Sequence, residues 1–207
     1  MPVRGAVAKI PRRSVTARSS RKQSWLPTMN ALPCAGFAAS SAFAAKLWSP
    51  GLKKVATLPK LRKTLVKAEK GDVLELDEMW SYVFARRNKR WVWLAQCRRT
   101  RQIVAYALGD RSEATCALLW KRVPEDYKGA TLYSDFWEAY QKVLPDAQHE
   151  ATGKGAGQTC HIERFNNIIR QRLGRFVRKT LSFSKCDEMH EMCLRLFLHE
   201  HNMNCQH

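Results

Sequence analysis

The chain has 207 residues and a formal net charge of +18. This length supplies one sizeable core with a small appendage, and no apolar run reaches the length of a membrane span, so an integral membrane protein is excluded. The seven cysteines are scattered and never form a Cys-x-x-Cys pair, so we expect reduced thiols in a reducing compartment such as the cytoplasm.

The positive charge is concentrated at the N-terminus. Residues 1–70 contain 15 Lys/Arg and a single acid, Glu69, whereas residues 71–207 contain 21 Lys/Arg and 17 acids. We therefore divide the chain into a basic arm with a linker, residues 1–70, and a nearly balanced globular domain, residues 71–207. Residues 1–50 lack any sustained hydrophobic period and are expected to be poorly ordered, and basic arms of this kind usually bind nucleic acid.

Three strands are predicted after Gly71. Residues 72–80 alternate, with Val73, Glu75, Asp77 and Met79 on one face and Leu74, Leu76 and Glu78 on the other. Residues 91–97 and 103–109 are rich in bulky apolar groups, and short polar turns separate them. Strands joined in this way form an antiparallel meander.

Helices and strands alternate in the remainder of the domain. Ser112 is expected to cap a helix that ends near Val123, a short strand at 130–134 ends at Asp135, and Pro145 stops a helix over 136–144. A strand around His149, the glycine-rich loop 152–158, a helix from 159 and a last helix over 184–202 complete the order. This order predicts an α/β fold with a mixed sheet flanked by helices.

The helix that begins at residue 159 carries two stripes. Ile162, Phe165, Ile169, Leu173 and Phe176 form an apolar stripe at helical spacing. A second stripe carries Glu163, Asn166, Asn167, Arg170 and Gly174, and the basic residues Arg172, Arg175, Arg178 and Lys179 follow it closely. On the helix alone, Glu163 is either a surface acid paired with nearby arginines or a metal ligand beside a groove for phosphate.

Three acids occupy positions typical of a metal site. Asp77 lies on the first strand, Asp135 at the end of the fourth, and Glu163 on the later helix. If the first and fourth strands are neighbours, Asp77 and Asp135 can converge and the helix can bring Glu163 over them. Sparse carboxylate shells suit Mg²⁺, and two such ions roughly 3.5–4 Å apart support phosphoryl transfer.

Several other residues have simpler interpretations. We expect Glu75 to face solvent; the alternative is an outer-shell acid, because Glu75 shares the strand face of Asp77. His161 is expected to serve the helix start or a substrate contact rather than to be a metal ligand. The tryptophans are expected to lie in the core, with Trp137 left open as a base-stacking residue. The cysteines and histidines of the last helix could form zinc pairs, but buried cysteines and a polar tail are the simpler interpretation.

Four motifs together resemble the catalytic half of the insertion-sequence-1 family of bacterial transposases. They are LELDEMW, LYSDFWEAY, HIERFNNIIRQRLGRF and VRKTLSFSK, and the resemblance covers about residues 71–203. It implies a ribonuclease-H-like fold, an Asp-Asp-Glu triad at Asp77, Asp135 and Glu163, and two Mg²⁺ or Mn²⁺ ions held by that triad. The DNA-binding set we predict is Asn167, Arg170, Arg172, Arg175, Arg178 and Lys179.

The resemblance implies a DNA transposase that cleaves and joins strands of an insertion sequence. Its partners would be double-stranded DNA at element ends and targets and further copies of the chain on DNA, in the cytoplasm at the bacterial nucleoid. Members of this family usually carry a cysteine-pair zinc module and a helix-turn-helix upstream, and residues 1–60 show neither. Two alternatives therefore stay open: a nuclease of the same fold, and a non-catalytic DNA-binding regulator of transposition.

Overall fold

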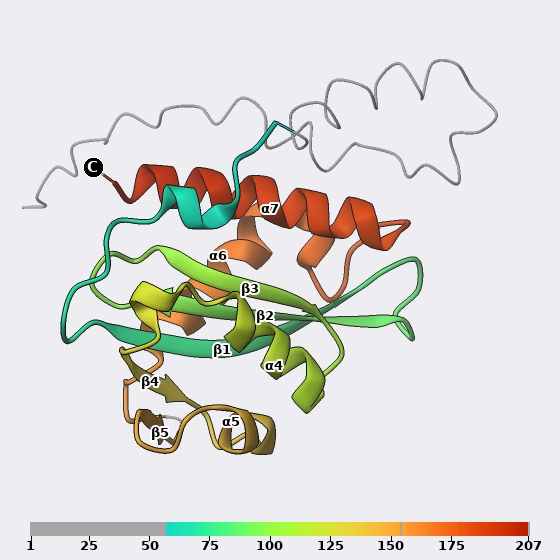
Figure 1. The fold of residues 1–207 in the computed structure, drawn as a ribbon. Helices are drawn as coiled ribbons and strands as arrows, with labels where there is room; N and C mark the ends of the chain where they lie inside the picture. The colour runs from blue at the N-terminus through green and yellow to red at the C-terminus, as the bar shows by residue number, and fades with distance from the viewer. Residues whose placement is uncertain (1–56, 154, 207) are drawn as a thin grey trace, which may run out of the picture.

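The structure, a computed structural model, describes residues 57–153 and 155–206 (Figure 1). The predictions for residues 1–56, including those for Cys34 and most of the basic arm, lie outside the described residues. The elements, in chain order, are η1 (Leu61–Thr64), β1 (Val73–Tyr82), β2 (Lys89–Cys97), β3 (Ile103–Gly109), α4 (Glu113–Arg122), η2 (Glu125–Tyr127), β4 (Thr131–Ser134), α5 (Glu138–Val143), β5 (His149–Ala151), α6 (Cys160–Arg172), η3 (Gly174–Phe176) and α7 (Asp187–Asn204).

The strands form one five-stranded sheet in the order β3-β2-β1-β4-β5. β1 and β2 pair antiparallel, as do β2 and β3, which confirms the predicted meander. β4 pairs parallel with both β1 and β5. The predicted mixed sheet flanked by helices is confirmed, and so is the condition that the first and fourth strands are neighbours.

The pairing register sets the two strand acids at the same level. Glu75 of β1 lies opposite Tyr133 of β4 in the parallel pair. Asp77 and Asp135 each follow two residues later, so continuing this register brings them side by side where β4 ends. Parallel neighbours with their carboxyl ends at one edge are a common location of functional sites in α/β sheets.

Each face of the sheet has its own core. Met79, Val92 and Leu94 pack against the buried residues of α6 and α7, whereas Leu74 and Leu76 pack against those of α4 and α5. Figure 1 shows these two helix pairs on opposite sides of the sheet. The alternation predicted for β1 therefore separates two buried faces.

Local sequence explains how α4 begins and which side of α6 is buried. The Ser112 hydroxyl accepts a hydrogen bond from the Thr115 amide, which confirms the predicted cap of α4. All five residues of the apolar stripe of α6 and η3 are at most 1% exposed. That burial fixes which side of α6 remains for the polar stripe.

Residues 57–70 lie against the domain. Thr64 in η1 is 1% exposed, and its hydroxyl accepts a hydrogen bond from the Asn202 side chain of α7. The Val66 amide donates to the Gln102 side chain, and its carbonyl accepts from the Tyr127 hydroxyl. This stretch is held by side chains from three distant parts of the domain. Among the described residues, no helix is both long and apolar enough to cross a membrane.

Candidate active site

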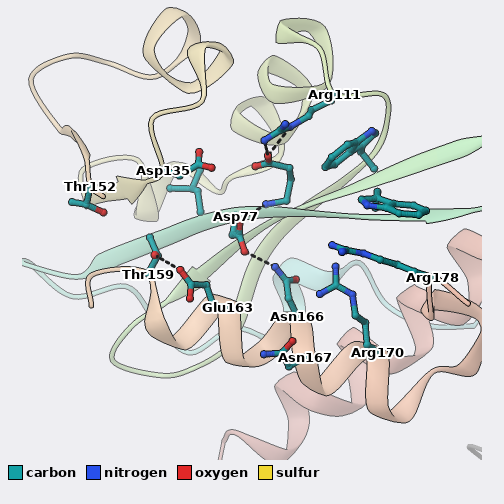
Figure 2. A pocket seen from close by; sticks show the side chains of 14 residues that line it. Asp77, Arg111, Asp135, Thr152, Thr159, Glu163, Asn166, Asn167, Arg170 and Arg178 are labelled. Atoms are coloured by element: carbon teal, nitrogen blue, oxygen red, sulfur yellow. Dashed lines mark hydrogen bonds and ion pairs between the residues drawn. The ribbon is translucent and has the colours of Figure 1, made fainter. Parts of the chain in front are cut away.

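A cavity of about 580 Å³ opens where β1, β4 and α6 meet, and it contains all three predicted acids (Figure 2). Asp135 and Glu163 lie toward one end of the cavity, and Arg170 and Arg178 lie toward the other (Figure 2). Its walls are formed by Leu76, Asp77, Glu78, Trp80, Trp91, Arg111, Asp135, Thr152, Thr159, Glu163, Asn166, Asn167, Arg170 and Arg178.

Asp77 is the innermost of the three predicted acids. Its Oδ1 accepts a hydrogen bond of 2.9 Å from the Glu78 amide, and its Oδ2 accepts one of 2.7 Å from the Asn166 side chain. Burial first, and then the neighbouring carboxylates of Glu78 and Asp135, raise the pKa of Asp77 to about 7, although the two hydrogen bonds lower it. The carboxyl group therefore lies where negative charge is costly until a cation compensates it.

Asp135 follows the last residue of β4 and is half-buried. Its Oδ1 accepts a hydrogen bond of 3.0 Å from the Trp137 amide, which holds the side chain at the turn into α5. The charge of Asp135 contributes to the raised pKa of both Asp77 and Glu78. The two strand acids thus act on each other electrostatically.

Glu163 lies in the first turn of α6 and is exposed. Its Oε1 accepts a hydrogen bond of 2.9 Å from the Thr159 hydroxyl, so the carboxylate is turned back toward the helix start. Asp77 and Glu163 line one cavity from two different elements. Within residues 57–153 and 155–206, no three His, Cys, Asp or Glu side chains form a ready metal-binding group.

The donor set nevertheless fits a hard divalent cation. Mg²⁺ is commonly held by one or two protein carboxylates, with waters and substrate phosphate as the other ligands, so a complete protein cage is not required. Asp77 and Asp135 supply two such carboxylates that already repel each other. The buried Oδ1 of Asn166, beside Asp77, has no hydrogen-bond partner among the described residues and is a further oxygen at this place.

The basic end of the cavity contains Asn167, Arg170 and Arg178, three of the residues predicted to bind DNA. Burial, with the nearby charge of Arg178, lowers the pKa of Arg170. Its buried Nε has no hydrogen-bond partner in the described part of the chain. Figure 2 shows the side chains of Arg170 and Arg178 reaching the same region of the cavity. Two converging guanidinium groups favour an anion between them.

Three other predicted DNA-binding residues do not line the cavity. Arg172 is exposed near the end of α6, nine residues after Glu163, which at helical pitch turns it to the opposite side of the helix. Lys179 is exposed outside the cavity. Arg175 is 4% exposed and donates to the Phe183 carbonyl. The prediction that Arg175 faces DNA conflicts with this burial, because η3 turns the side chain inward.

Glu78 and Arg111 line the cavity, although the sequence did not suggest them. The Glu78 carboxylate forms an ion pair of 2.5 Å with Arg111 and accepts a hydrogen bond from the Tyr140 hydroxyl. Burial and the charge of Asp135 raise the pKa of Glu78, and Arg111 lowers it. The Arg111 guanidinium also lies 3.8 Å from the ring centre of Trp137. Trp137, left open as a base-stacking residue, is thus covered by a cation.

Two of the remaining tryptophans are wall residues rather than core residues. Trp80 and Trp91 are paired across β1 and β2 and both line the cavity, whereas Trp93 is fully buried. The Arg178 guanidinium lies 5.1 Å from the ring centre of Trp80. Alternation along β2 places Trp91 and Trp93 on the same face, so only the position of Trp91 near the end of the strand makes it a wall residue rather than a core residue.

The expectation that Glu75 faces solvent is wrong. Glu75 is 0% exposed and accepts hydrogen bonds from Arg98, from the His161 ring and from two backbone amides of α6. His161 therefore serves the helix start, one of its two predicted roles. The sequence signal was present, since Glu75 shares the strand face of Asp77, but the helix that covers this face lies more than 80 residues away.

The histidines and cysteines of the last helix are mostly enclosed. His190 is 1% exposed, and its two ring nitrogens are bonded to the hydroxyl groups of Ser81 and Ser184. Burial lowers the pKa of His190 to about 4, so the ring is neutral at physiological pH. No disulfide joins the cysteines that the structure describes.

The region of the chain that forms this cavity is similar to known proteins. Residues 72–204 match the protein family described as IS1 transposase. The insertion element iso-IS1n protein InsB of Shigella dysenteriae is 36% identical over 129 residues, which cover 62% of this chain and 95% of that protein. The insertion element IS1 protein InsB of Shigella flexneri is 35% identical over 124 residues, or 60% of this chain and 92% of that protein. The matched region contains β1, β4, α6 and every residue of the cavity wall, and the chain belongs to the IS1 transposase family.

Proposed function

We propose that this protein is a metal-dependent transposase that cleaves the ends of an insertion sequence and joins them to target DNA. The observation that carries the proposal is the division of one cavity into two parts. Asp77 of β1, Asp135 just after β4 and Glu163 of α6 lie toward one end, and Arg170 and Arg178 lie toward the other (Figure 2). No ion pair joins either arginine to an acid within the described residues. A phosphodiester beside bound cations requires both parts.

The acids have distinct roles in this proposal. Asp77 and Asp135 would hold Mg²⁺ or Mn²⁺, with two ions bound, and Glu163 would complete the shell of the second after leaving Thr159. When bound, these ions supply Lewis acidity that activates the attacking oxygen and stabilises the leaving one. Burial favours the protonated form of Asp77 and raises its pKa. A bound cation would take the place of that proton and compensate the charge of the carboxylate.

The basic end positions the DNA backbone. Arg170 has a planar fork of donors, and its unpartnered Nε is available to a phosphate oxygen. Arg178 lies over Trp80 and approaches the same region from beyond η3. Asn167 adds a neutral amide on the exposed side of α6. These side chains bind and orient a phosphate without reading base sequence.

The partners follow from the same chemistry. The substrate is double-stranded DNA at element ends and target sites, and the basic residues 1–70 add affinity that does not depend on sequence. Because two ends must be joined in one event, we propose a homo-oligomer on DNA, in the cytoplasm at the bacterial nucleoid.

The test is strand cleavage and joining on DNA that carries the sequences flanking the gene. Asp77→Asn, Asp135→Asn and Glu163→Gln should each abolish both reactions in Mg²⁺ and in Mn²⁺. Glu138→Gln is a matched control, because Glu138 is an exposed acid paired with Lys142 on α5 and should leave both reactions unchanged. Cleavage without joining by the parent protein would favour a nuclease, and DNA binding without either reaction would favour a regulator.

A further inference from the structure

A buried ionic cluster lies directly beneath the start of α6, outside the cavity. Its centre is Glu75 of β1, whose side chain is fully enclosed. Its Oε1 accepts from the Arg98 Nε at 2.8 Å and is 2.6 Å from the His161 Nδ1. Its Oε2 accepts from the backbone amides of His161 and Ile162 at 3.0 and 3.1 Å. A carboxylate with this many partners on two elements connects those elements.

The amides that Glu75 binds are those that a helix normally leaves without a partner. Thr159, the residue before α6, makes no side-chain capping hydrogen bond. A side chain at that position usually accepts from the second or third helical amide, here those of His161 and Ile162. Glu75 supplies this cap from the sheet, and its negative charge also interacts favourably with the helix dipole. The start of α6 is therefore anchored to β1 rather than to its own chain.

Arg98 adds further contacts that hold the start of α6 against β1. Besides the ion pair with Glu75, its Nη2 donates to the backbone carbonyl and side-chain oxygen of Gln158 at 2.5 and 3.0 Å. The same guanidinium lies 5.0 Å from the ring centre of Tyr133 on β4. One arginine thus connects β1, β4 and the last residues of the loop that leads into α6.

The segments that Glu75 and Arg98 connect, which are β1, β4 and the start of α6, are also the segments that hold or directly precede the three acids. Glu75 precedes Asp77 by two residues on the same strand face, and Tyr133 precedes Asp135 by two residues on β4. Ile162, whose amide Glu75 binds, immediately precedes Glu163. The only other side-chain hydrogen bond between β1 and α6 that the described residues show is that of Asn166 to Asp77, and it uses an oxygen that a metal ion would also need.

We propose that Glu75 and Arg98 are positioning residues that fix Glu163 relative to Asp77 and Asp135 and thereby set the affinity of the acid site for divalent cations. This inference rests on the proposed function and adds to it a pair of residues that touch neither DNA nor metal. Glu75 holds the start of α6 in the same way whether or not Asp77 is engaged by a cation, so the backbone position of Glu163 relative to β1 is set before metal binds, and only its side chain must turn.

The experiment measures Mn²⁺ binding by electron paramagnetic resonance of the free ion, on the full chain without DNA. Glu75→Gln keeps the shape of the side chain but removes its charge, and Arg98→Lys keeps the charge but removes the fork of donors. Both should weaken Mn²⁺ binding about 10-fold, the lower end of the loss seen when groups that orient metal ligands are removed. The double variant Glu75→Gln with Glu163→Gln should bind Mn²⁺ within about twofold of Glu163→Gln alone, because Glu75 acts through Glu163.

Asp72→Asn is the matched control. Asp72 is also a buried acid paired with an arginine, Arg99, and it precedes β1; the side-chain hydrogen bonds described for it join it to Arg99 and Glu69, not to α6. This variant should lower the melting temperature and leave Mn²⁺ affinity unchanged. If Glu75→Gln and Arg98→Lys behave like Asp72→Asn, they are merely structural and the inference is overturned while the proposed function stands. If Asp77→Asn binds Mn²⁺ as the parent does, the acid site itself is wrong and the proposed function fails.

Discussion

Replacing Asp77 with Asn should stabilise the metal-free protein while it abolishes catalysis. Burial first, and then the carboxylates of Glu78 and Asp135, raise the pKa of Asp77 from 3.8 to about 7. The ionised carboxylate therefore destabilises the folded state at neutral pH when no cation is present. An amide of the same shape removes that charge.

The size of the effect follows from the shift. A rise of about 3 pKa units corresponds to about 4 kcal/mol at a pH above 7. The amide has one acceptor oxygen instead of two, and losing one hydrogen bond costs about 1 kcal/mol. The unpartnered Oδ1 of Asn166 offers a compensating acceptor for the new amide group. We expect a net gain of about 3 kcal/mol, or about 6–12 °C in melting temperature for a domain of this size.

The pH dependence has a definite sign. Asp77 ionises near 3.8 in the unfolded chain and near 7 in the folded protein, so the folded state binds the extra proton between these values. The parent therefore loses stability from Asp77 as the pH rises through this window, whereas Asp77→Asn does not. The two proteins should differ little near pH 4 and most at pH 8.

The assay is thermal unfolding in EDTA at a series of pH values between about 4 and 8. Glu163→Gln is the control, because Glu163 is exposed and its replacement should change stability by no more than about 0.5 kcal/mol. Adding Mg²⁺ at pH 8 should raise the melting temperature of the parent and not that of Asp77→Asn. An Asp77→Asn protein less stable than the parent at pH 8 in EDTA would refute the reasoning.

Three further predictions concern DNA. Arg170→Ala should slow joining at saturating DNA, because Arg170 lies in the cavity with a free Nε; an unchanged rate with a lower melting temperature would make it structural. Replacing Arg178 and Lys179 with Ala should weaken DNA binding by an amount that shrinks as salt rises, and equal loss at low and high salt in fluorescence anisotropy would contradict it. Removing residues 1–56, which contain ten Lys/Arg and no acid, should lower the slope of log K against log salt by about 0.9 for each phosphate that the arm neutralises. The cut must spare Thr64, which is buried, and an unchanged slope would show that the arm is not engaged.

The sequence predicted the elements well because their signals are local. Alternation in β1, the Ser112 cap and the apolar stripe of α6 each depend on a few neighbouring residues, and the structure confirms all of them. The predicted convergence of Asp77 and Asp135 requires β1 and β4 to be neighbours, and the structure confirms that they are. With that adjacency, the positions of Asp77 and Asp135 at one sheet edge follow from the pattern.

The predictions for Glu75 and Arg175 conflict with the structure for the same physical reason, which is contact between distant parts of the chain. Glu75 has the sequence of an exposed strand acid, but α6 covers it, and only the final packing of a helix 86 residues later shows this. Arg175 belongs to a run of basic residues that looks uniform, but the turn η3 buries this one member. Burial of a single polar group depends on tertiary packing, so the hydrophobic periodicity of the neighbouring sequence does not predict it.

The attachment of α6 to β1 also has a consequence for how the protein becomes active during synthesis. The two hydrogen-bonded links from β1 to α6 span 86 to 89 residues, and Phe165 of α6 stacks on Phe197 of α7. Contacts this distant in sequence are slow to form, because a long loop must close before they can be made. A chain interrupted after β5 would hold both sheet acids but neither the third acid nor the arginines. Under the proposed function, an incomplete translation product would therefore lack a complete site, and cleavage of DNA would require that the whole polypeptide has folded.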